Sequence, residues 1–326
     1  MSKRYQPPCT VTPAMLSMVA NIAETIGRLQ AQPNRLLRLR KANRIRTIQG
    51  SLAIEGNTLA EAQITAILQG KRVVAPPAEI KEVRNAIKVY DRLAQWQPQE
   101  QGDLLSAHAL LMEGLLDAAG AYRRGNVGVM GGAQVVHVAP PAKRVSGLMT
   151  ELFQWLQQTD LHPLVASSIF HYEFEFIHPF ADGNGRMGRL WQSLLLYQWN
   201  PLFQDLPVES MIFARQQDYY RALNQSTQSA DAAPFLEFML QVIQSTLDSP
   251  QVTPQVTPQV EALLSALKGE MSRTELMEAL GLSDRKSFRQ RYLLPALQIG
   301  LIEMTIPDKP NSRLQKYRLV LKGTKK

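Results

Sequence analysis

The sequence predicts a mainly α-helical protein with one β-hairpin in its main domain and a small α+β domain at its C-terminal end. Up to residue 248, apolar residues mostly recur at spacings of three and four, which is the period of amphipathic helices. The segment 126–138 instead has two short β-branched runs around Gly131–Gly132, which is typical of a hairpin. Prolines at 250, 254 and 258 interrupt both patterns and indicate an extended linker over 249–258.

The first hundred residues are expected to form an N-terminal helical region. Thr12 and Pro13 mark the start of one helix, and a second follows Pro33. The arginines and lysines of this second helix are interleaved with apolar residues, which favours a solvated helix face over a nucleic-acid site. Thr58 and Glu61 form the pattern of a capping box, so we expect a third helix to begin there and a fourth over Ile80–Trp96.

Residues 101–248 are expected to form the main helical domain, with the 126–138 hairpin inserted in it. A lone two-stranded ribbon is marginally stable, so this hairpin has to pack on the helices. Asp103 is placed as the cap of the first helix. The expected helices are Leu104–Ala118, Val145–Gln157, Leu164–Phe176, Arg186–Trp199, Glu209–Thr227 and Pro234–Leu247.

Residues 259–326 resemble a winged-helix domain. Two helices around a glycine-containing turn are followed by two short strand-like segments, Leu301–Ile306 and Leu314–Val320. The second of these helices is expected over Ser283–Ile299. It carries four basic side chains, Arg285, Lys286, Arg289 and Arg291.

The composition limits the kind of protein and its partners. The chain has 326 residues, of which 45% are apolar, and no apolar run of signal-peptide or membrane-spanning length, so we expect a cytoplasmic protein without a membrane partner. Its single cysteine, Cys9, can form neither an internal disulfide nor a thiolate metal site. The net charge is +8; from Gln259 onward there are 13 Lys/Arg against 7 Asp/Glu. An anionic partner is therefore expected, chiefly at the C-terminal end.

The segment from His178 to Arg189, H-P-F-A-D-G-N-G-R-M-G-R, contains most of what a nucleotide site requires. The main-chain N–H groups of Gly183–Gly185, at the start of a helix, can surround an anion such as a di- or triphosphate. Asp182 can hold Mg²⁺ together with phosphate oxygens. Arg186 and Arg189 lie three residues apart on one helical face, so both can point at the phosphates.

His178 precedes this anion site and can accept a proton from a hydroxyl near neutral pH, so we assign it as the general base. Phe180 is expected to pack beneath the loop. Three further histidines of the main domain are expected to have no catalytic role: His162 is expected on the surface, and His108 and His171 in packed or solvated helical positions.

These residues resemble the Fic family motif H-x-F-x-(D/E)-G-N-G-R-x-x-R at every specified position. The resemblance implies a Fic-type helical bundle that transfers AMP from ATP, with Mg²⁺, to a serine, threonine or tyrosine hydroxyl of a target protein. It also implies that Asn184 steadies the α-phosphate, that pyrophosphate leaves toward Arg186, and that Tyr220 lies beside the adenine. The hairpin resembles the flap that aligns a target segment by main-chain pairing, here through Val127, Gly128, Val129 and Met130.

The segment Ser51–Gly56 resembles the inhibitory motif (S/T)-x-x-x-E-(G/N) of Fic proteins. The resemblance implies that Glu55 pairs with Arg189, competes with the γ-phosphate and makes ATP bind unproductively. Ser51 and Gly56 are the motif's other specified residues. The same glutamate could also position a water molecule for removal of AMP from a modified protein.

Other functions stay open at this point. The chain could be a regulator whose winged helix binds DNA or protein and whose Fic-like domain senses nucleotide. It could also be a transferase for another nucleotide or for phosphocholine, although the G-N-G pattern favours a nucleotide. Because Fic relatives often dimerise, a homodimer is a further expectation.

Overall fold

The structure is a computed structural model that describes residues 5–30, 33–131, 134–249, 258–298, 301–307, 309–310 and 312–319. For 33–41 and 129–137 it describes the backbone only. The chain divides into two compact units, 1–26 with 41–247 and 27–40 with 248–326. Residues on both sides of position 100 therefore belong to one unit, which contains the 178–189 motif.

The N-terminal helices agree with the sequence pattern, with one correction. Helices α1 (Pro13–Gln30) and α2 (Pro33–Ile54) begin at prolines, and α3 (Glu61–Leu68) and α4 (Pro77–Asp91) follow, with a 3₁₀ turn η1 at Leu93–Gln95. The predicted Thr58–Glu61 capping box is wrong. The carboxylate of Glu79 accepts hydrogen bonds from the N–H and hydroxyl of Thr58 at 2.7 and 2.8 Å, and the Gln63 side chain accepts from the Ala60 N–H at 3.0 Å.

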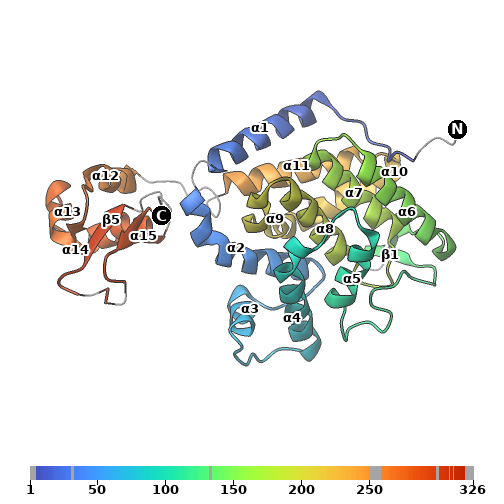
Figure 1. Ribbon diagram of the computed structural model, residues 1–326, viewed down its shortest axis with the longest axis horizontal. Coiled ribbons are helices and arrows are strands. Elements are labelled where there is room, and N and C mark those ends of the chain that lie inside the picture. The colour runs from blue at the N-terminus through green and yellow to red at the C-terminus, as the bar shows by residue number, and fades with distance from the viewer. Residues whose placement is uncertain are drawn as a thin grey trace. The chain divides into compact units, whose positions relative to one another are not determined.

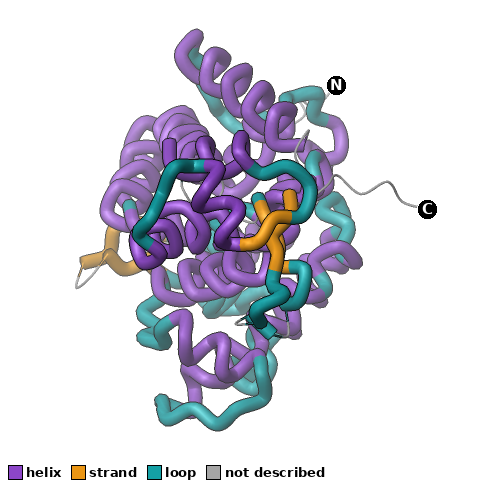
Figure 2. The backbone as a smooth tube through the Cα atoms, turned by 90° about the vertical axis from the view of Figure 1, so that its left-hand side faces the viewer, coloured by secondary structure: helices purple, strands orange, loops and turns teal. Residues whose placement is uncertain are grey.

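Helix α5 and the hairpin are the next elements along the chain. Helix α5 spans Gln101–Leu111, so Asp103 lies within its first turn and not at its cap; its carboxylate accepts from the Gln97 N–H at 2.7 Å. The predicted hairpin is confirmed as strands β1 (Gly128–Gly131) and β2 (Gln134–Val138), which pair antiparallel with an irregularity between Val129 and Met130. Figure 2 shows the strands in orange among the purple helices.

Two buried helices, α7 (Pro163–Ile177) and α8 (Asn184–Trp199), pack against each other at the centre of this unit (Figure 1). Every residue of α7 from Leu164 to Phe174 is buried, including the polar residues Ser167, Ser168, His171 and Glu173. The 178–189 motif is the connection between these two helices and the first turns of α8. It is therefore held by the best-packed elements of the unit.

The helices around this pair are α6 (Ala142–Gln158), α9 (Val208–Ala214), α10 (Gln216–Ser229) and α11 (Ala233–Asp248), with the 3₁₀ turn η2 at Pro201–Asp205. The single helix predicted over Glu209–Thr227 is wrong, because the chain turns at Arg215, with φ −120° and ψ 32°. No glycine or proline marks this turn. The guanidinium of Arg215 lies over the Phe238 ring, 5.0 Å from the ring centroid.

The C-terminal part of the second unit has the predicted α+β composition. It contains α12 (Pro258–Ala266), α13 (Arg273–Ala279), α14 (Arg285–Phe288), the π-helical turn η3 (Arg289–Leu293) and α15 (Leu294–Gln298). Strands β4 (Ile302–Met304) and β5 (Lys316–Leu319) were expected, whereas β3 (Met271–Ser272) was missed. The antiparallel sheet order is β3-β5-β4. Val260, Leu263, Phe288 and Tyr317 are among its core residues. The predicted linker lies mostly outside the described residues.

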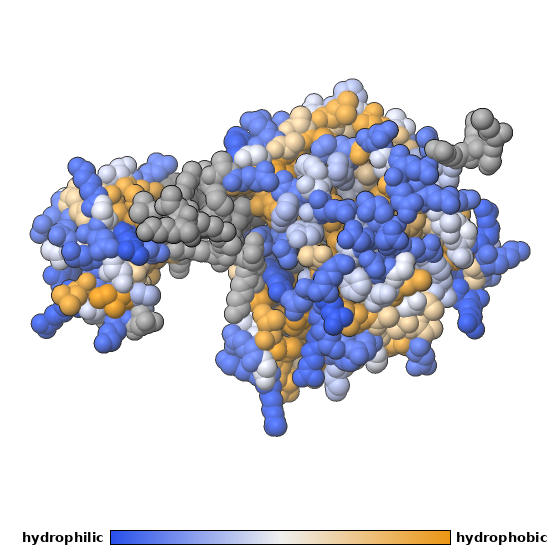
Figure 3. All heavy atoms as spheres, in the orientation of Figure 1, coloured by the Kyte–Doolittle hydropathy of each residue, from blue (hydrophilic) through white to orange (hydrophobic). Residues whose placement is uncertain are grey.

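The surface drawn in Figure 3 is largely hydrophilic, with smaller apolar patches between the charged side chains. Within the described ranges, no helix is both long and apolar enough to cross a membrane. The apolar residues of the sequence are instead used for packing: helix faces supply a core that includes Ile22, Val83, Phe170 and Trp191, all of them fully buried.

Candidate active site

His178 lies at the C-terminal end of α7 in a left-handed backbone conformation, with φ 50° and ψ 62°. Its N–H donates to the Phe174 carbonyl at 2.9 Å. Its ring atom Nδ1 is 3.3 Å from the carbonyl oxygen of Glu175. Because a carbonyl can only accept, this contact favours the tautomer with the proton on Nδ1. Nε2 is then the ring nitrogen that lacks a proton.

The start of α8 presents an anion site next to this histidine. Gly183, the residue before the helix, has φ 84°, a conformation that favours glycine. The first intrahelical bond runs from the Met187 N–H to the Gly183 carbonyl. The N–H groups of Asn184, Gly185 and Arg186 precede it and have no partner within the helix. Together with the helix dipole they suit a phosphate group.

Asn184 closes the loop on itself. Its side-chain oxygen accepts from the Phe180 N–H at 2.8 Å, and its amide nitrogen donates to the Phe180 carbonyl at 3.0 Å. Phe180 is fully buried, as predicted. The structure thus uses the side chain of Asn184 to brace the loop; its predicted contact with the α-phosphate stays a prediction.

His108 is a second brace, which the sequence did not reveal. Its Nδ1 accepts from the Gly120 N–H at 2.9 Å, so Nε2 carries the proton and donates to the Asp182 carbonyl at 3.0 Å. The ring stacks on Phe180 with centroids 3.6 Å apart. Burial lowers the pKa of His108, which keeps it neutral. The predicted packed role is correct, but only the tertiary contacts show that it supports the loop.

Arg186 lies between two carboxylates. Its Nη2 is 3.2 Å from Oδ1 of Asp182, and its Nη1 is 3.1 Å from Oε1 of Glu82 on α4, a partner that the sequence did not indicate. Its Nε is buried and has no hydrogen-bond partner among the described residues. An unsatisfied buried donor costs stability, so this N–H is suited to an acceptor on a bound molecule.

Arg189 is more deeply enclosed, with only 1% of its surface exposed. Its Nη2 donates to the carbonyl of Ser51 at 2.9 Å and to Oε1 of Glu55 at 2.7 Å, and its Nε donates to the Ser51 hydroxyl at 3.3 Å. Burial lowers the pKa of Arg189, but the charge and hydrogen bond of Glu55, together with Tyr219 and Glu175, raise it by more in total, so the net shift is upward. Its Nη1 is buried without a partner among the described residues.

Glu55 follows the last residue of α2 on a tight corner. Its N–H donates to the Leu52 carbonyl at 3.0 Å, and Gly56 has φ 92°. The carboxylate lies directly over Gly185, because a Cβ added to that glycine would collide with Oε1 of Glu55. Glu55 thus covers part of the anion site at the start of α8, and the sequence-predicted residues of the two motifs come together.

Glu175 was also missed from the sequence. Its Oε2 lies 3.9 Å from His178 Nδ1, and its Oε1 lies 3.8 Å from His171 Nε2. Burial raises the pKa of Glu175 to about 8, while attraction to Arg189 lowers it and repulsion by Glu55 raises it. The carboxyl is therefore mostly protonated at neutral pH.

Tyr220 lies beside the corner that follows the last residue of α2, Ile54. Its hydroxyl is 3.4 Å from the carbonyl of Ile54, which also accepts from Nε2 of Gln216 at 2.9 Å. The Tyr220 side chain is partly exposed, whereas its neighbour Tyr219 is buried and contacts His171. The adenine-side role of Tyr220 stays a prediction.

The hairpin residues assigned to target alignment are placed by their backbone. Gly128 pairs with Val138, Val129 with His137 and Met130 with Val135, whereas Val127 precedes the first strand. The side chains of Val129 and Met130 lie outside the description.

Two further histidines of the main domain, His171 and His162, have structural roles. His171 is fully buried; burial lowers its pKa to about 3, and its Nδ1 lies 2.6 Å from the Gln192 side-chain oxygen. His162 caps α7 by accepting from the Leu164 N–H at 3.2 Å and packs edge-on against Trp199. His171 is thus packed, as expected, and His162 is half-buried at a helix end.

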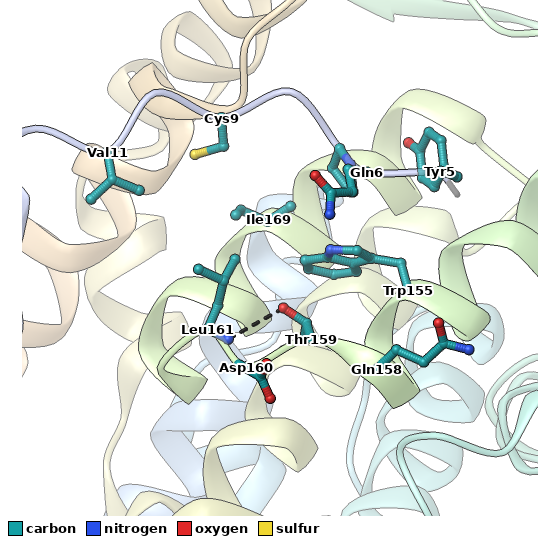
Figure 4. A pocket seen from close by; sticks show the side chains of 11 residues that line it. Tyr5, Gln6, Cys9, Val11, Trp155, Gln158, Thr159, Asp160, Leu161 and Ile169 are labelled. Carbon is teal, nitrogen blue, oxygen red and sulfur yellow. Dashed lines mark hydrogen bonds between the residues drawn. The ribbon is translucent and has the colours of Figure 1, made fainter. Parts of the chain in front are cut away.

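A cavity of about 470 Å³ lies beneath the N-terminal segment (Figure 4). Its walls come from that segment, the end of α6 and one residue of α7, and include Tyr5, Cys9, Trp155, Thr159 and Ile169. Burial raises the pKa of the Cys9 thiol to about 12, so this thiol is a weak nucleophile. The cavity contains no residue of the 178–189 motif or of Ser51–Gly56 and is separate from the candidate site.

Comparison with known proteins agrees with this geometry. The Fic/DOC family matches residues 98–196, and a family described as the C-terminal domain of Fic-like "filamentation induced by cAMP" proteins matches residues 258–320. The crystal structure of a Fic family protein from Desulfovibrio desulfuricans G20 is 55% identical, covers 98% of this chain and 100% of that chain, and has a TM-score of 0.74. The chain belongs to the Fic family.

More distant Fic relatives match only part of this chain. A protein adenylyltransferase Fic from Nematostella vectensis is 30% identical over 214 residues, which cover 62% of this chain and 47% of that protein. This chain thus spans about half the length of that relative. Fic-1 from C. elegans shares 21% identity, with 72% of this chain and 71% of that chain covered and a TM-score of 0.61, which supports the Fic fold. The predicted family and fold class are therefore confirmed.

Proposed function

We propose that this Fic protein transfers AMP from ATP to a serine, threonine or tyrosine hydroxyl of another protein. One observation carries the proposal. Beside His178, the free N-terminus of α8 is flanked by two buried arginine N–H groups, Arg186 Nε and Arg189 Nη1, that have no acceptor among the described residues. Donors arranged in this way suit a polyphosphate. Relatives named protein adenylyltransferase support the choice of nucleotide transfer.

The residues provide a balanced reaction. Nε2 of His178 takes the proton from the target hydroxyl, whose oxygen forms a bond to the α-phosphorus. The bond from this phosphorus to the bridging oxygen breaks, and pyrophosphate leaves beside Arg186. Main-chain N–H groups of Asn184 and Gly185 stabilise the charge on the phosphoryl oxygens, because they are fixed at the helix start before the substrate arrives.

The residues at the site fit a magnesium ion bound together with the nucleotide. Asp182 is the carboxylate that would hold it, since its side chain is 62% exposed beside the anion site. Within the described ranges, no cluster of three or more His, Cys, Asp or Glu side chains could hold a metal. Mg²⁺ commonly binds one or two carboxylates plus phosphate oxygens and waters, and it neutralises phosphate charge. One exposed carboxylate suits this mode.

The hairpin is proposed to align the target protein. An extended segment can add to its backbone by main-chain pairing, which sets position without requiring a particular target sequence. The side chains of the strands then matter less than where the hairpin is held relative to His178.

Glu55 is proposed to restrain this activity. Its carboxylate occupies the space over Gly185 and engages Arg189 at 2.7 Å, so it competes with the terminal phosphate for the arginine and repels it. ATP then binds in a pose that does not present the α-phosphate to His178.

Mass spectrometry of the Glu55→Gly protein incubated with ATP, Mg²⁺ and cell lysate tests the proposal. We expect a mass increase of one AMP on this protein or on a lysate protein, and no increase with the added His178→Ala substitution. Incorporation of another nucleotide or of phosphocholine would overturn the assignment of the group. Release of AMP from a premodified protein by wild type, but not by Glu55→Gly, would show that Glu55 supports the reverse reaction.

We propose a second function, in which the C-terminal unit acts as a winged helix and binds DNA. The observation that favours it is a difference between basic side chains that form ion pairs and those that do not. Arg285, Lys286, Arg289 and Arg291 are exposed, and none forms an ion pair with a described residue. Arg318 on β5, by comparison, is paired with Glu270 and Glu303 at 2.9 and 2.8 Å. Unpaired cations along one short helical segment suit the phosphates of a duplex.

Gel shifts of the full chain on duplex DNA over a salt series test this second function. We expect affinity to fall as salt rises, and a shallower salt dependence for Arg285→Gln with Arg289→Gln than for wild type. Arg318→Gln is the matched control, because its charge is already paired. Equal binding by the helix variant and the control would contradict DNA binding through this helix and leave a protein partner as the remaining prediction.

A further inference from the structure

Arg123 is a buried arginine outside both sequence motifs. Only 6% of its surface is exposed, and its guanidinium donates to four main-chain carbonyls. Its Nε donates to His178 at 2.7 Å, Nη1 to Gly125 at 2.9 Å, and Nη2 to Pro140 at 2.6 Å and Ile177 at 3.3 Å. Its own N–H donates to the Pro179 carbonyl at 2.9 Å. Five contacts from one residue thus converge on the catalytic segment and the hairpin.

Two of these carbonyls, of Ile177 and His178, lie at the C-terminal end of α7. The last carbonyls of a helix have no partner within it and carry the negative end of its dipole. Arg123 forms no ion pair with a carboxylate of the described residues, so these carbonyls and those of the hairpin stems balance its charge. Breaking this arrangement leaves buried carbonyls unpaired at the residue that is proposed to accept the proton.

The other two carbonyls belong to the two stems of the hairpin. Gly125 lies three residues before β1, and Pro140 lies two residues after β2. The stems are also joined by the Asn126 side chain, whose oxygen accepts from the Ala142 N–H at 2.9 Å. The planar guanidinium therefore connects both stems to the backbone of His178, a connection that the point-like ammonium of lysine cannot reproduce.

We propose that Arg123 is a positioning residue that locks His178 and both hairpin stems into one rigid frame, so that a docked target hydroxyl meets the His178 ring. The inference rests on the proposed AMP transfer and deepens it. It separates two parts of the site: Arg123 contacts the segment 177–179 and the stems, whereas the residues that bind phosphate begin at Gly183. Loss of Arg123 should therefore affect turnover much more than ATP binding, because geometry at the reacting atoms is more sensitive than binding.

The test compares Arg123→Lys and Arg123→Gln with Arg124→Lys and Arg124→Gln, all in the Glu55→Gly background. Arg124 is the adjacent residue and is exposed, so it is a matched control. We expect at least a tenfold loss of kcat for both Arg123 variants, with KM for ATP within about twofold of the background. The Arg124 variants should keep the background rate.

Hydrogen exchange followed by mass spectrometry provides a readout that does not depend on activity. Peptides covering 126–140 and 174–180 should exchange faster in Arg123→Lys than in Arg124→Lys, with unchanged exchange in α11 showing that the variant is folded. Equal kcat for the two lysine variants, or a parallel loss of ATP affinity and kcat, would overturn the proposal. If the Glu55→Gly background transfers no AMP, the proposed function fails, and equal exchange rates would then separately refute the Arg123 frame.

Discussion

The two arginines of the Fic motif lie one helical turn apart, yet they are bound by different parts of the chain. Arg186 is 6% exposed and is paired with Asp182, from its own loop, and Glu82, from α4. Arg189 is 1% exposed and is held by Ser51 and Glu55, at the end of α2. One arginine is thus tied into the site itself, whereas the other is held by a separate segment of the chain.

The difference supports the proposal that the site is complete but restrained by Glu55. The partners of Arg186 can stay in place while nucleotide binds, because Asp182 is itself a proposed part of the nucleotide site. The partner of Arg189 cannot, because the Glu55 carboxylate fills the space over Gly185. Removing Glu55 should therefore change activity more than removing Glu82.

The largest effect is expected when Arg189 is removed from the unrestrained protein. Glu55→Gly with Arg189→Ala should transfer AMP about a hundredfold more slowly than Glu55→Gly alone, since charge-assisted contacts to phosphate are lost. Initial rates of AMP incorporation from labelled ATP measure this. Equal rates would show that Arg189 serves only to hold Glu55. Arg215→Ala, which removes an arginine outside the motif, is the control for general effects on folding.

A smaller effect is expected from removing the charge of Glu55 while keeping its size. Glu55→Gln should raise AMP incorporation about tenfold over wild type and remain below Glu55→Gly, because the amide still fills the space over Gly185 but no longer repels phosphate. The test compares the rates of AMP incorporation by wild type, Glu55→Gln and Glu55→Gly at one ATP concentration. A Glu55→Gln protein as inactive as wild type would mean that bulk, and not charge, causes the restraint.

Glu82→Gln tests the other arginine. In the Glu55→Gly background it should change ATP affinity by only about two- to threefold, because Asp182 still pairs with Arg186. Calorimetric titration with ATP and Mg²⁺ measures this change in ATP affinity. Glu79→Gln is the control on the same helix, since the Glu79 carboxylate accepts hydrogen bonds from Thr58 and pairs with no arginine among the described residues. An effect as large as that of Glu55 would erase the distinction between the two arginines.

The last expected effect concerns stability and pH, because Arg189 has a second carboxyl nearby in Glu175. Burial raises the pKa of Glu175 to about 8 in the folded protein. In the unfolded chain this carboxyl has the ordinary pKa of a glutamate, so it loses its proton at a lower pH than in the folded protein. Its contribution to stability is fully present below that ordinary pKa and is lost as pH rises toward 8, by on the order of 5 kcal/mol.

Thermal unfolding midpoints between pH 5 and pH 8.5 test this sign. The midpoint of wild type should fall over this range more than that of Glu175→Gln, whereas Glu151→Gln, at an exposed position, should follow wild type. A Glu175→Gln protein with the same pH dependence as wild type would contradict the buried protonated carboxyl. Below pH 6.5, buried His171, with its pKa lowered to about 3, should destabilise both proteins alike as the unfolded chain takes up a proton.

Sequence reasoning located the motifs well because their residues are contiguous. The pattern from His178 to Arg189 and the one from Ser51 to Gly56 each contain their own spacing, and the structure brings them together. The residues that were missed, such as His108, Glu82 and Arg123, act through partners 74, 104 and 55 positions away. Nothing in their local sequence distinguishes them from ordinary helix or loop residues.

Errors in the fold have the same cause. Thr58 is an appropriate cap by local pattern, but Glu79 on another helix takes its hydrogen bonds. The two-residue strand β3 exists only because β5 pairs with it. The turn at Arg215 has no local signal, whereas the hairpin was recognised because its glycines and β-branched runs are adjacent in sequence. Homodimerisation and cytoplasmic location stay predictions.

If Glu55 restrains the site as proposed, its contact with Arg189 also sets how strong a signal must be to activate the protein. If the corner at Glu55 and Gly56 alternates between held and released positions, resting activity reports the released fraction. A hundredfold restraint corresponds to about 2.7 kcal/mol, so a partner that binds the released form about a hundredfold more tightly would bring the two forms to equal populations. One ion pair at a helix end would thus set the threshold for the whole molecule.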